Sequence, residues 1–235
     1  MLAFNEQSRA DRVIVALDCD RDTAMDLAEK LSGHAKWLKV GMTLFYAEGP
    51  AIVKAFKDLG FNVFLDLKFH DIPHQVAGAA ASAIASGADM ITMHAVGGVP
   101  MMQAAQKSVD ESGKDVITLA ITVLTSMNDE ILAQTGVERG MAEQVRALAE
   151  CAKEARVSGV VSSPQEAAML REILGPDACI VTPGVRPVGA DLGDQSRVAT
   201  PKAAFDNGAS HIVVGRPITQ AEDPVAAFDA IAASL

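Results

Sequence analysis

Three charged side chains lie within six residues in the segment 66–71, Asp-Leu-Lys-Phe-His-Asp. Asp66 and Lys68 are two positions apart at the end of an apolar run typical of a strand, so their side chains should share one face of it. Asp71 follows in the loop, and Pro73 suits the first turn of a helix, where a missing N–H costs nothing. Flanking carboxylates should keep Lys68 protonated, which favours a proton donor over a Schiff-base nucleophile. The array predicts acid–base chemistry at the carboxyl end of a strand.

The same residues also have a purely structural interpretation. Asp66 and Lys68 could form an ion pair, and Asp71 could cap a helix. Three charges at the end of a strand that is apolar on both sides would, however, be costly to bury for packing alone. The array as a whole therefore favours the catalytic interpretation.

Further polar residues stand at the ends of other apolar runs. Asp18 ends the first run, Lys39 lies in the second, and His94 ends the fourth. Thr125 and Ser126 follow the fifth. Each alone is weak evidence, since Asp18 could cap a helix and a lone His94 is more often a hydrogen-bonded structural group. Their placement on one common rim is the stronger indication of a site.

The last apolar run ends in Val-Val-Gly-Arg-Pro at 213–217. Gly215 lets backbone amides approach an oxyanion, and Arg216 supplies a bidentate donor. Arg186 and Gln195, in the preceding polar loop, could reach the same anion, although Arg186 could equally face solvent. Because the loops after strands seven and eight of a (β/α)₈ barrel often bind phosphate, these residues predict a phosphate site.

Alternating strands and helices must position these residues. The helical stretches are Ala-rich and amphipathic, and the strands read as apolar runs buried on both faces of a parallel sheet. The expected strands are Val13–Leu17, Trp37–Gly41, Asn62–Leu67, Met90–His94, Ile117–Val123, Gly159–Ser162, Ile180–Thr182 and His211–Gly215. The expected helices include Asp22–Leu31, Pro50–Leu59, Ala77–Ser86, Met141–Ala155, Gln165–Leu174 and Asp223–Ala232. Eight regularly spaced strands predict an α/β fold, a (β/α)₈ TIM barrel.

An open doubly wound sheet is the alternative, because a sequence does not show closure. Such a sheet would predict a Gly-rich loop after the first strand, but Leu-Asp-Cys-Asp stands at 17–20. Because the segment contains no GxGxxG motif, the sequence does not support a dinucleotide site. No linker or charge run marks a boundary, so we expect residues 1–235 to form a single barrel domain, with 186–197 as its longest candidate functional loop.

Composition narrows the functional class. Of 235 residues, 49% are hydrophobic and 21% are charged, which is ordinary for a soluble globular enzyme. A net charge of −10 disfavours a general nucleic-acid binder, since phosphate backbones require clustered basic residues. Three cysteines without a CxxC suggest neither a disulfide framework nor a zinc site. The start lacks a signal-peptide pattern and no stretch is long enough to span a membrane, so we expect a cytoplasmic protein.

Six separated motifs, in order, resemble those of the bacterial orotidine 5′-phosphate decarboxylases over essentially the whole chain. They are VALD at 15–18, KVGM at 39–42, DLKFHDIP at 66–73, VLTS at 123–126, TPGVRP at 182–187 and VVGRP at 213–217. The resemblance implies a homodimeric (β/α)₈ barrel that converts orotidine 5′-phosphate to UMP without a metal or an organic cofactor.

The resemblance also implies roles for individual residues. Lys68 would protonate the pyrimidine carbon that loses carbon dioxide, while Asp66 holds Lys68 and faces the substrate carboxylate. Asp71 would reach the neighbouring subunit's site, with Ile72 lining the same pocket. The remaining roles are ribose binding by Asp18 and Lys39, base contacts from Thr125 and Ser126, phosphate binding by Gln195, Gly215 and Arg216, and support of that loop by Arg186.

One departure and two rival functions remain. Gln75 stands where the family often has Thr, which puts a minor ribose contact at the dimer edge in doubt.

The nearest rival is a magnesium-dependent sugar-phosphate decarboxylase or aldolase of the same superfamily. In those relatives a metal-binding Glu usually stands where Lys39 does, and a lysine there should repel a second cation. The other rival is a catalytically silent, nucleotide-binding barrel, which should tolerate loss of Lys68.

Overall fold

The barrel predicted from the strand pattern is confirmed in the computed structural model, which describes residues 4–187 and 199–235. Eight parallel strands follow one another in chain order, and the last pairs with the first to close the sheet. The strands are β1 (Val13–Leu17), β2 (Trp37–Gly41), β3 (Asn62–Phe69), β4 (Met90–His94), β5 (Ile117–Ile121), β6 (Gly159–Val161), β7 (Cys179–Thr182) and β8 (His211–Val214). Closure leaves no sheet edge exposed.

Several predicted strand ends were wrong by one or two residues. β5 ends at Ile121, β6 at Val161 and β8 at Val214, each earlier than expected, whereas β3 continues to Phe69. The early ends have a local cause, because polar and glycine residues there already belong to the following loops. For example, Gly215 is the N-cap of a short helix.

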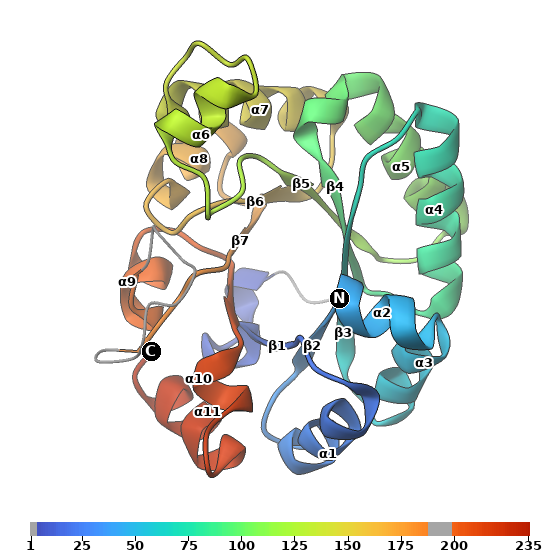
Figure 1. The fold of residues 1–235 in the computed structure, drawn as a ribbon, viewed down its shortest axis with the longest axis vertical. Coiled ribbons are helices and arrows are strands. Elements are labelled where there is room, and N and C mark those ends of the chain that lie inside the picture. The colour runs from blue at the N-terminus through green and yellow to red at the C-terminus, as the bar shows by residue number, and fades with distance from the viewer. Residues whose placement is uncertain (1–3, 188–198) are drawn as a thin grey trace.

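Helices surround the barrel, as Figure 1 shows. Those that fall on expected stretches are α1 (Arg21–Leu31), α3 (Ala51–Asp58), α4 (Pro73–Ser86), α7 (Met141–Ala155), α8 (Ala167–Leu174) and α11 (Pro224–Ala233). The others are α2 (Met42–Glu48), α5 (Gly98–Ser112), α6 (Asp129–Gln134), α9 (Pro201–Asp206) and α10 (Arg216–Thr219). Most of this second group are short, and α5 begins with the weak helix formers Gly-Val-Pro.

Apolar residues form two cores, one between the helices and the outside of the barrel and one inside the barrel. The inner core includes Trp37 on β2 and Phe64 on β3. Because side chains alternate along a strand, the next inward position after Trp37 is Lys39, and the next after Phe64 is Asp66. The apolar layers therefore give way to charged side chains toward the carboxyl ends of the strands.

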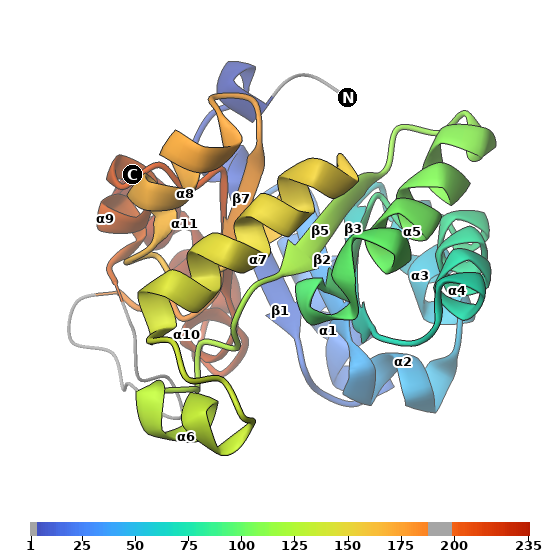
Figure 2. The ribbon, with the colours of Figure 1, turned by 90° about the horizontal axis from the view of Figure 1, so that it is seen from above.

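The two ends of the barrel differ. Figure 2 shows α2 and α6 at one end and the N-terminal segment at the other. At the N-terminal end, the ring of Phe4 lies under the guanidinium groups of Arg12 and Arg171. Arg171 also donates hydrogen bonds to Ala178 O and Gly208 O, which joins two loops there. Among the described residues, no helix is long and apolar enough to cross a membrane.

Candidate active site

Four charged side chains of alternating sign form a row at the carboxyl ends of β1, β2 and β3. Lys39 Nζ lies 2.9 Å from Asp18 Oδ1 and 3.7 Å from Asp66 Oδ2. Lys68 Nζ lies 2.8 Å from the same Asp66 oxygen. The row Asp18–Lys39–Asp66–Lys68 therefore brings together residues separated by up to 50 positions in the chain. The sequence predicts all four on one rim, but it does not predict the pairing of Lys39 with Asp66.

Asp66 is the buried centre of this row, with only 8% of its surface exposed. Burial alone would raise the pKa of its carboxyl group. The charges of Lys39 and Lys68, with hydrogen bonds from Lys68 and Thr92, outweigh burial and lower that pKa below its usual value. Asp66 is therefore ionised at neutral pH and holds two ammonium groups around one carboxylate.

Lys68 reaches Asp66 through an irregular backbone, not through the regular strand that the sequence suggested. Its φ is 55°, in the left-handed region that non-glycine residues rarely adopt. The pairing of β3 with β4 shifts between Leu65 and Phe69, so the side-chain alternation assumed for Asp66 and Lys68 does not hold there. The expected contact is present, but its geometry comes from a bulge.

Gly41 makes room for the row. A Cβ atom built at Gly41 would lie 2.6 Å from Asp18 Oδ1 and 3.0 Å from Lys39 Nζ. The Asp18–Lys39 pair could not keep its position beside any larger residue. A glycine two residues after an inward-facing lysine is a sequence signal of such a close approach.

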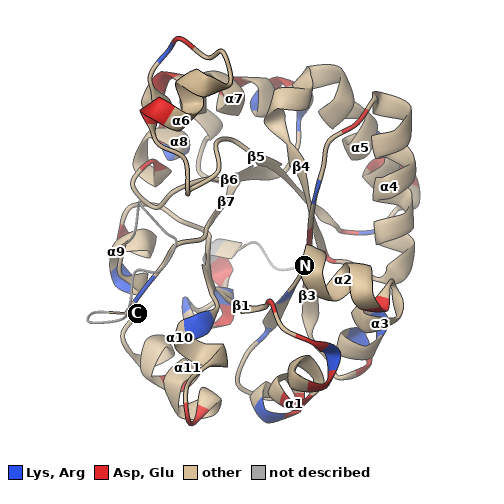
Figure 3. Ribbon diagram, viewed as in Figure 1, with Lys and Arg blue, Asp and Glu red and all other residues tan. Residues whose placement is uncertain are grey.

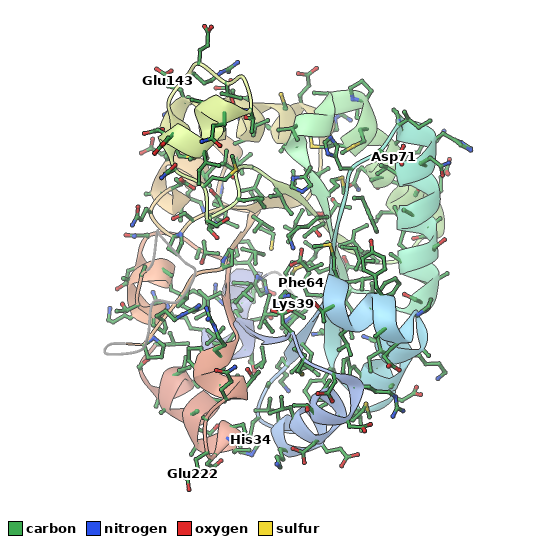
Figure 4. All side chains as sticks on the ribbon, in the orientation of Figure 1. His34, Lys39, Phe64, Asp71, Glu143 and Glu222 are labelled. Carbon is green, nitrogen blue, oxygen red and sulfur yellow. The ribbon has the colours of Figure 1, made fainter. Side chains whose placement is uncertain are left out.

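Asp71 is apart from the other charged residues. It is exposed, and its Oδ1 accepts a hydrogen bond from Ile72 N at 2.7 Å. Figure 4 shows Lys39 and Phe64 near the centre of the barrel and Asp71 well away from them, beside α4. Within the described part of the chain, no ion pair joins Asp71 to Lys68. The helix-cap alternative was wrong, since Ile72 is the N-cap of α4.

Two adjoining cavities open beside the row. One has a volume of about 530 Å³ and the other about 240 Å³. Lys39, Pro183 and Val213 line both, so the two cavities adjoin at these residues. A space of this size and shape suits a small molecule with distinct groups at its two ends.

The larger cavity ends in polar groups suited to an anion. Its lining includes Arg186, Gly215 and Arg216 from the loops after β7 and β8. Arg216 is the first residue of α10, and Figure 3 shows basic colour on the α10 ribbon. Gln195, also expected at this end, lies outside the described residues.

The smaller cavity ends in polar groups suited to a flat ring. Thr125 and Ser126 line it together with the apolar side chains of Phe64, Ile121 and Val123. Asp66 and Lys68 lie on its wall, so this half of the charged row faces the smaller cavity. Ile72 lines neither cavity and is 63% exposed.

His94 stands near the row without joining it. Its ring centroid lies 5.5 Å from that of His70. Burial, the neighbouring His70 and the charge of Lys68 lower the pKa of His94, while Asp66 raises it by less. His94 is therefore neutral at neutral pH. Among residues 4–187 and 199–235, no three His, Cys, Asp or Glu side chains are grouped so that they could hold a metal ion.

Comparison with known proteins gives one consistent family. The family model described as Orotidine 5'-phosphate decarboxylase / HUMPS family matches residues 11–231. The orotidine 5'-phosphate decarboxylase of Moorella thermoacetica is 50% identical over 96% of this chain and 92% of its own. The orotidine 5'-phosphate decarboxylase of Pseudoalteromonas translucida is 49% identical over 93% of this chain and 94% of its own.

A solved structure agrees with these relatives. The crystal structure of orotidine 5'-phosphate decarboxylase from Lactobacillus acidophilus superposes with a TM-score of 0.84 at 40% identity, covering 94% of this chain and 97% of that one. The fold, the charged row and the matches over nearly the whole length lead to one conclusion. The chain belongs to the orotidine 5′-phosphate decarboxylase / HUMPS family.

Proposed function

We propose that the chain is a carboxy-lyase that decarboxylates orotidine 5′-phosphate to UMP in pyrimidine biosynthesis. The observation that carries this proposal is the charged row Asp18–Lys39–Asp66–Lys68. The row lines two adjoining cavities, one with Arg186 and Arg216 in its wall and the other with Thr125 and Ser126. The named relatives at about half identity support the same substrate.

In this proposal the substrate spans the two cavities in one direction. Its phosphate would lie at Arg216, its ribose at Asp18 and Lys39, and its pyrimidine ring at Thr125 and Ser126. This direction places the ring carboxylate next to Asp66 and Lys68, which line the ring-binding end. Binding energy from the phosphate, far from the reacting carbon, can then align the ring with Lys68.

The chemistry follows from this placement. When the bond to the carboxylate breaks, carbon dioxide leaves and the electron pair remains on a ring carbon that delocalises it poorly. The Lys68 ammonium stabilises this developing charge and then donates a proton to the carbon, forming UMP. Lys68 regains its proton from solvent, while Asp66 keeps the ammonium in place through the 2.8 Å contact.

A magnesium-dependent sugar-phosphate enzyme is the alternative within the same family. Lys39 argues against it, since its ammonium lies between the carboxylates of Asp18 and Asp66. A divalent cation held by those two carboxylates would meet the lysine charge. Lys39 therefore supplies the positive charge that a metal would supply in such an enzyme.

We also propose that the active enzyme is a homodimer in which Asp71 completes the partner's site. Asp71 does not reach Lys68 of its own chain, and Ile72 beside it is 63% exposed. Tyr46 on α2 and Val96 after β4 are also more than half exposed, and lie on loops or helices at the same end of the barrel. A second copy seated on this face would cover the apolar side chains and receive Asp71.

Product analysis tests the substrate assignment. Purified protein is incubated with orotidine 5′-phosphate or with a ketogulonate phosphate, and products are identified by mass spectrometry. We expect UMP and carbon dioxide in equal amounts from the first and no product from the second. Turnover of the sugar phosphate would support the metal-dependent alternative, and tight UMP binding without turnover would support a nucleotide sensor.

Arg216→Ala should separate phosphate binding from the rest of the site. We expect kcat/KM for orotidine 5′-phosphate to fall by about 10- to 150-fold, which corresponds to one charge-assisted hydrogen bond of about 1.5–3 kcal/mol. The slow reaction of orotidine, which lacks the phosphate, should be nearly unchanged and serves as the control. Equal losses on both substrates would instead mean that Arg216 maintains the barrel.

A further inference from the structure

One hydroxyl group joins the two residues proposed to carry the chemistry, and it comes from the neighbouring strand β4. Thr92 is in the middle of β4 and is completely buried. Its Oγ1 donates a hydrogen bond to Asp66 Oδ1 at 2.9 Å and accepts one from Lys68 N at 2.9 Å. The hydroxyl thus uses both its donor and its acceptor capacity on the charged row.

The position of Thr92 matches the irregularity in β3. Leu65 is opposite Ile91 and Phe69 is opposite Met93, so three residues of β3 stand against Thr92 alone. The bulge interrupts the ladder of backbone hydrogen bonds, and Lys68 N would lose its partner within the sheet. The Thr92 side chain supplies the missing acceptor.

The hydrogen bond from Lys68 N to Thr92 also explains how Lys68 keeps an unfavourable backbone conformation. Among the described non-glycine residues, only Lys68 and Arg156 have positive φ values. Arg156 is the C-cap of α7, where a left-handed residue is common, but Lys68 is within a strand. Such a conformation persists only when its surroundings hold it, and strained residues of this kind gather at functional sites.

The second bond of Thr92 fixes the Asp66 carboxylate. With Oδ1 bound to Thr92, Oδ2 faces Lys68 Nζ at 2.8 Å and Lys39 Nζ at 3.7 Å. Rotation of the carboxylate would break the Thr92 bond and move both ion pairs. One hydroxyl therefore constrains the main chain of Lys68 and the orientation of the carboxylate that holds its ammonium.

We propose that Thr92 is a positioning residue for the decarboxylation, which sets the location of the Lys68 ammonium by holding both the Lys68 backbone and the Asp66 carboxylate. Thr92 itself touches no substrate in this arrangement. This inference rests on the proposed function, because its effect on rate passes through Lys68 and Asp66.

Thr92→Val removes the hydroxyl while nearly keeping the volume. We expect kcat for orotidine 5′-phosphate to fall about 10- to 100-fold, as when supporting residues of a reactive group are lost, with KM changed by less than about threefold. Thr92→Ser keeps the hydroxyl and should retain kcat within about threefold of wild type. A Val variant with near wild-type kcat, or a Ser variant as slow as the Val variant, would overturn the proposal.

Thr118→Val is the matched control. Thr118 on β5 is also completely buried, and its hydroxyl bonds to Gln106 and Ser158, outside the charged row. The two Val variants should lose similar thermal stability, but only Thr92→Val should lose kcat. Equal loss of kcat in both variants would assign the effect to stability and refute the positioning role.

Amide hydrogen exchange of the wild-type protein tests the same contact even if Thr92→Val does not fold. The Lys68 amide should exchange as slowly as strand amides such as Leu65, because Thr92 accepts its hydrogen bond. Exchange as fast as in an open loop would contradict the inference. A wild-type protein that lacks decarboxylase activity would count against the proposed function instead, and the exchange result would still test the role of Thr92.

Discussion

Lys68→Ala is expected to lower kcat for orotidine 5′-phosphate by at least about 10⁴-fold, because in the proposed mechanism one side chain supplies both carbanion stabilisation and the proton. No neighbouring group replaces it, since Lys39 is held between Asp18 and Asp66. The rate of UMP formation under saturating substrate measures the loss. UMP itself should still bind nearly as well, because the phosphate and ribose contacts proposed above do not involve Lys68.

Lys68→Arg is the control for charge. Arginine keeps the positive charge beside Asp66 but donates its proton poorly, since its pKa is above 12. We expect it to recover little of the lost kcat, which would distinguish proton donation from a purely electrostatic role. An alanine variant that retains more than about one hundredth of wild-type kcat would exclude Lys68 as the proton donor, as general acids typically contribute 10²–10⁴-fold.

Mixing two inactive variants should restore activity if Asp71 acts across a dimer. Lys68→Ala and Asp71→Ala proteins should each be nearly inactive alone. After subunit exchange, each hybrid dimer has one doubly damaged site and one site with both residues intact. If half of the dimers are hybrids, activity should return to about a quarter of wild type. The assay is UMP formation, with exchange confirmed by mass spectrometry of differently tagged subunits.

A mixture of Lys68→Ala with Asp66→Ala is the matched control. Asp66 and Lys68 contact each other within one chain at 2.8 Å, so every site of that hybrid lacks one of them and activity should not return. No recovery in the Lys68–Asp71 mixture, with exchange confirmed, would refute the shared site. The assignment of decarboxylation would be unaffected.

Much of the fold could be predicted because its signals are local. Eight apolar runs of strand length gave the barrel, and β1, β2 and β4 begin and end where expected. Strand ends were less certain, because residues such as Gly215 are compatible with both a strand and the following turn. The helices α2, α6, α9 and α10 are too short to show a periodic pattern.

The proximity of four charged residues was predicted, but the geometry of their contacts was not, and Asp71 and Ile72 line neither cavity. Asp18, Lys39, Asp66 and Lys68 were all placed on one rim, because parallel strands bring their carboxyl ends together. The Lys39–Asp66 pair and the hydrogen bonds of Thr92 depend on strand register and on a bulge, which no local pattern reveals. A polar residue at an inward position of the apolar strand Met90–His94 was the available signal for Thr92.

We expect side chains alone to carry out this decarboxylation, without a bound metal ion. The most direct test is the rate of absorbance loss from orotidine 5′-phosphate, measured with protein stripped by a chelator and again with added magnesium. The proposed chemistry at Lys68 predicts rapid turnover at the same rate in both samples. Activity that disappears with the chelator and returns with magnesium would contradict it.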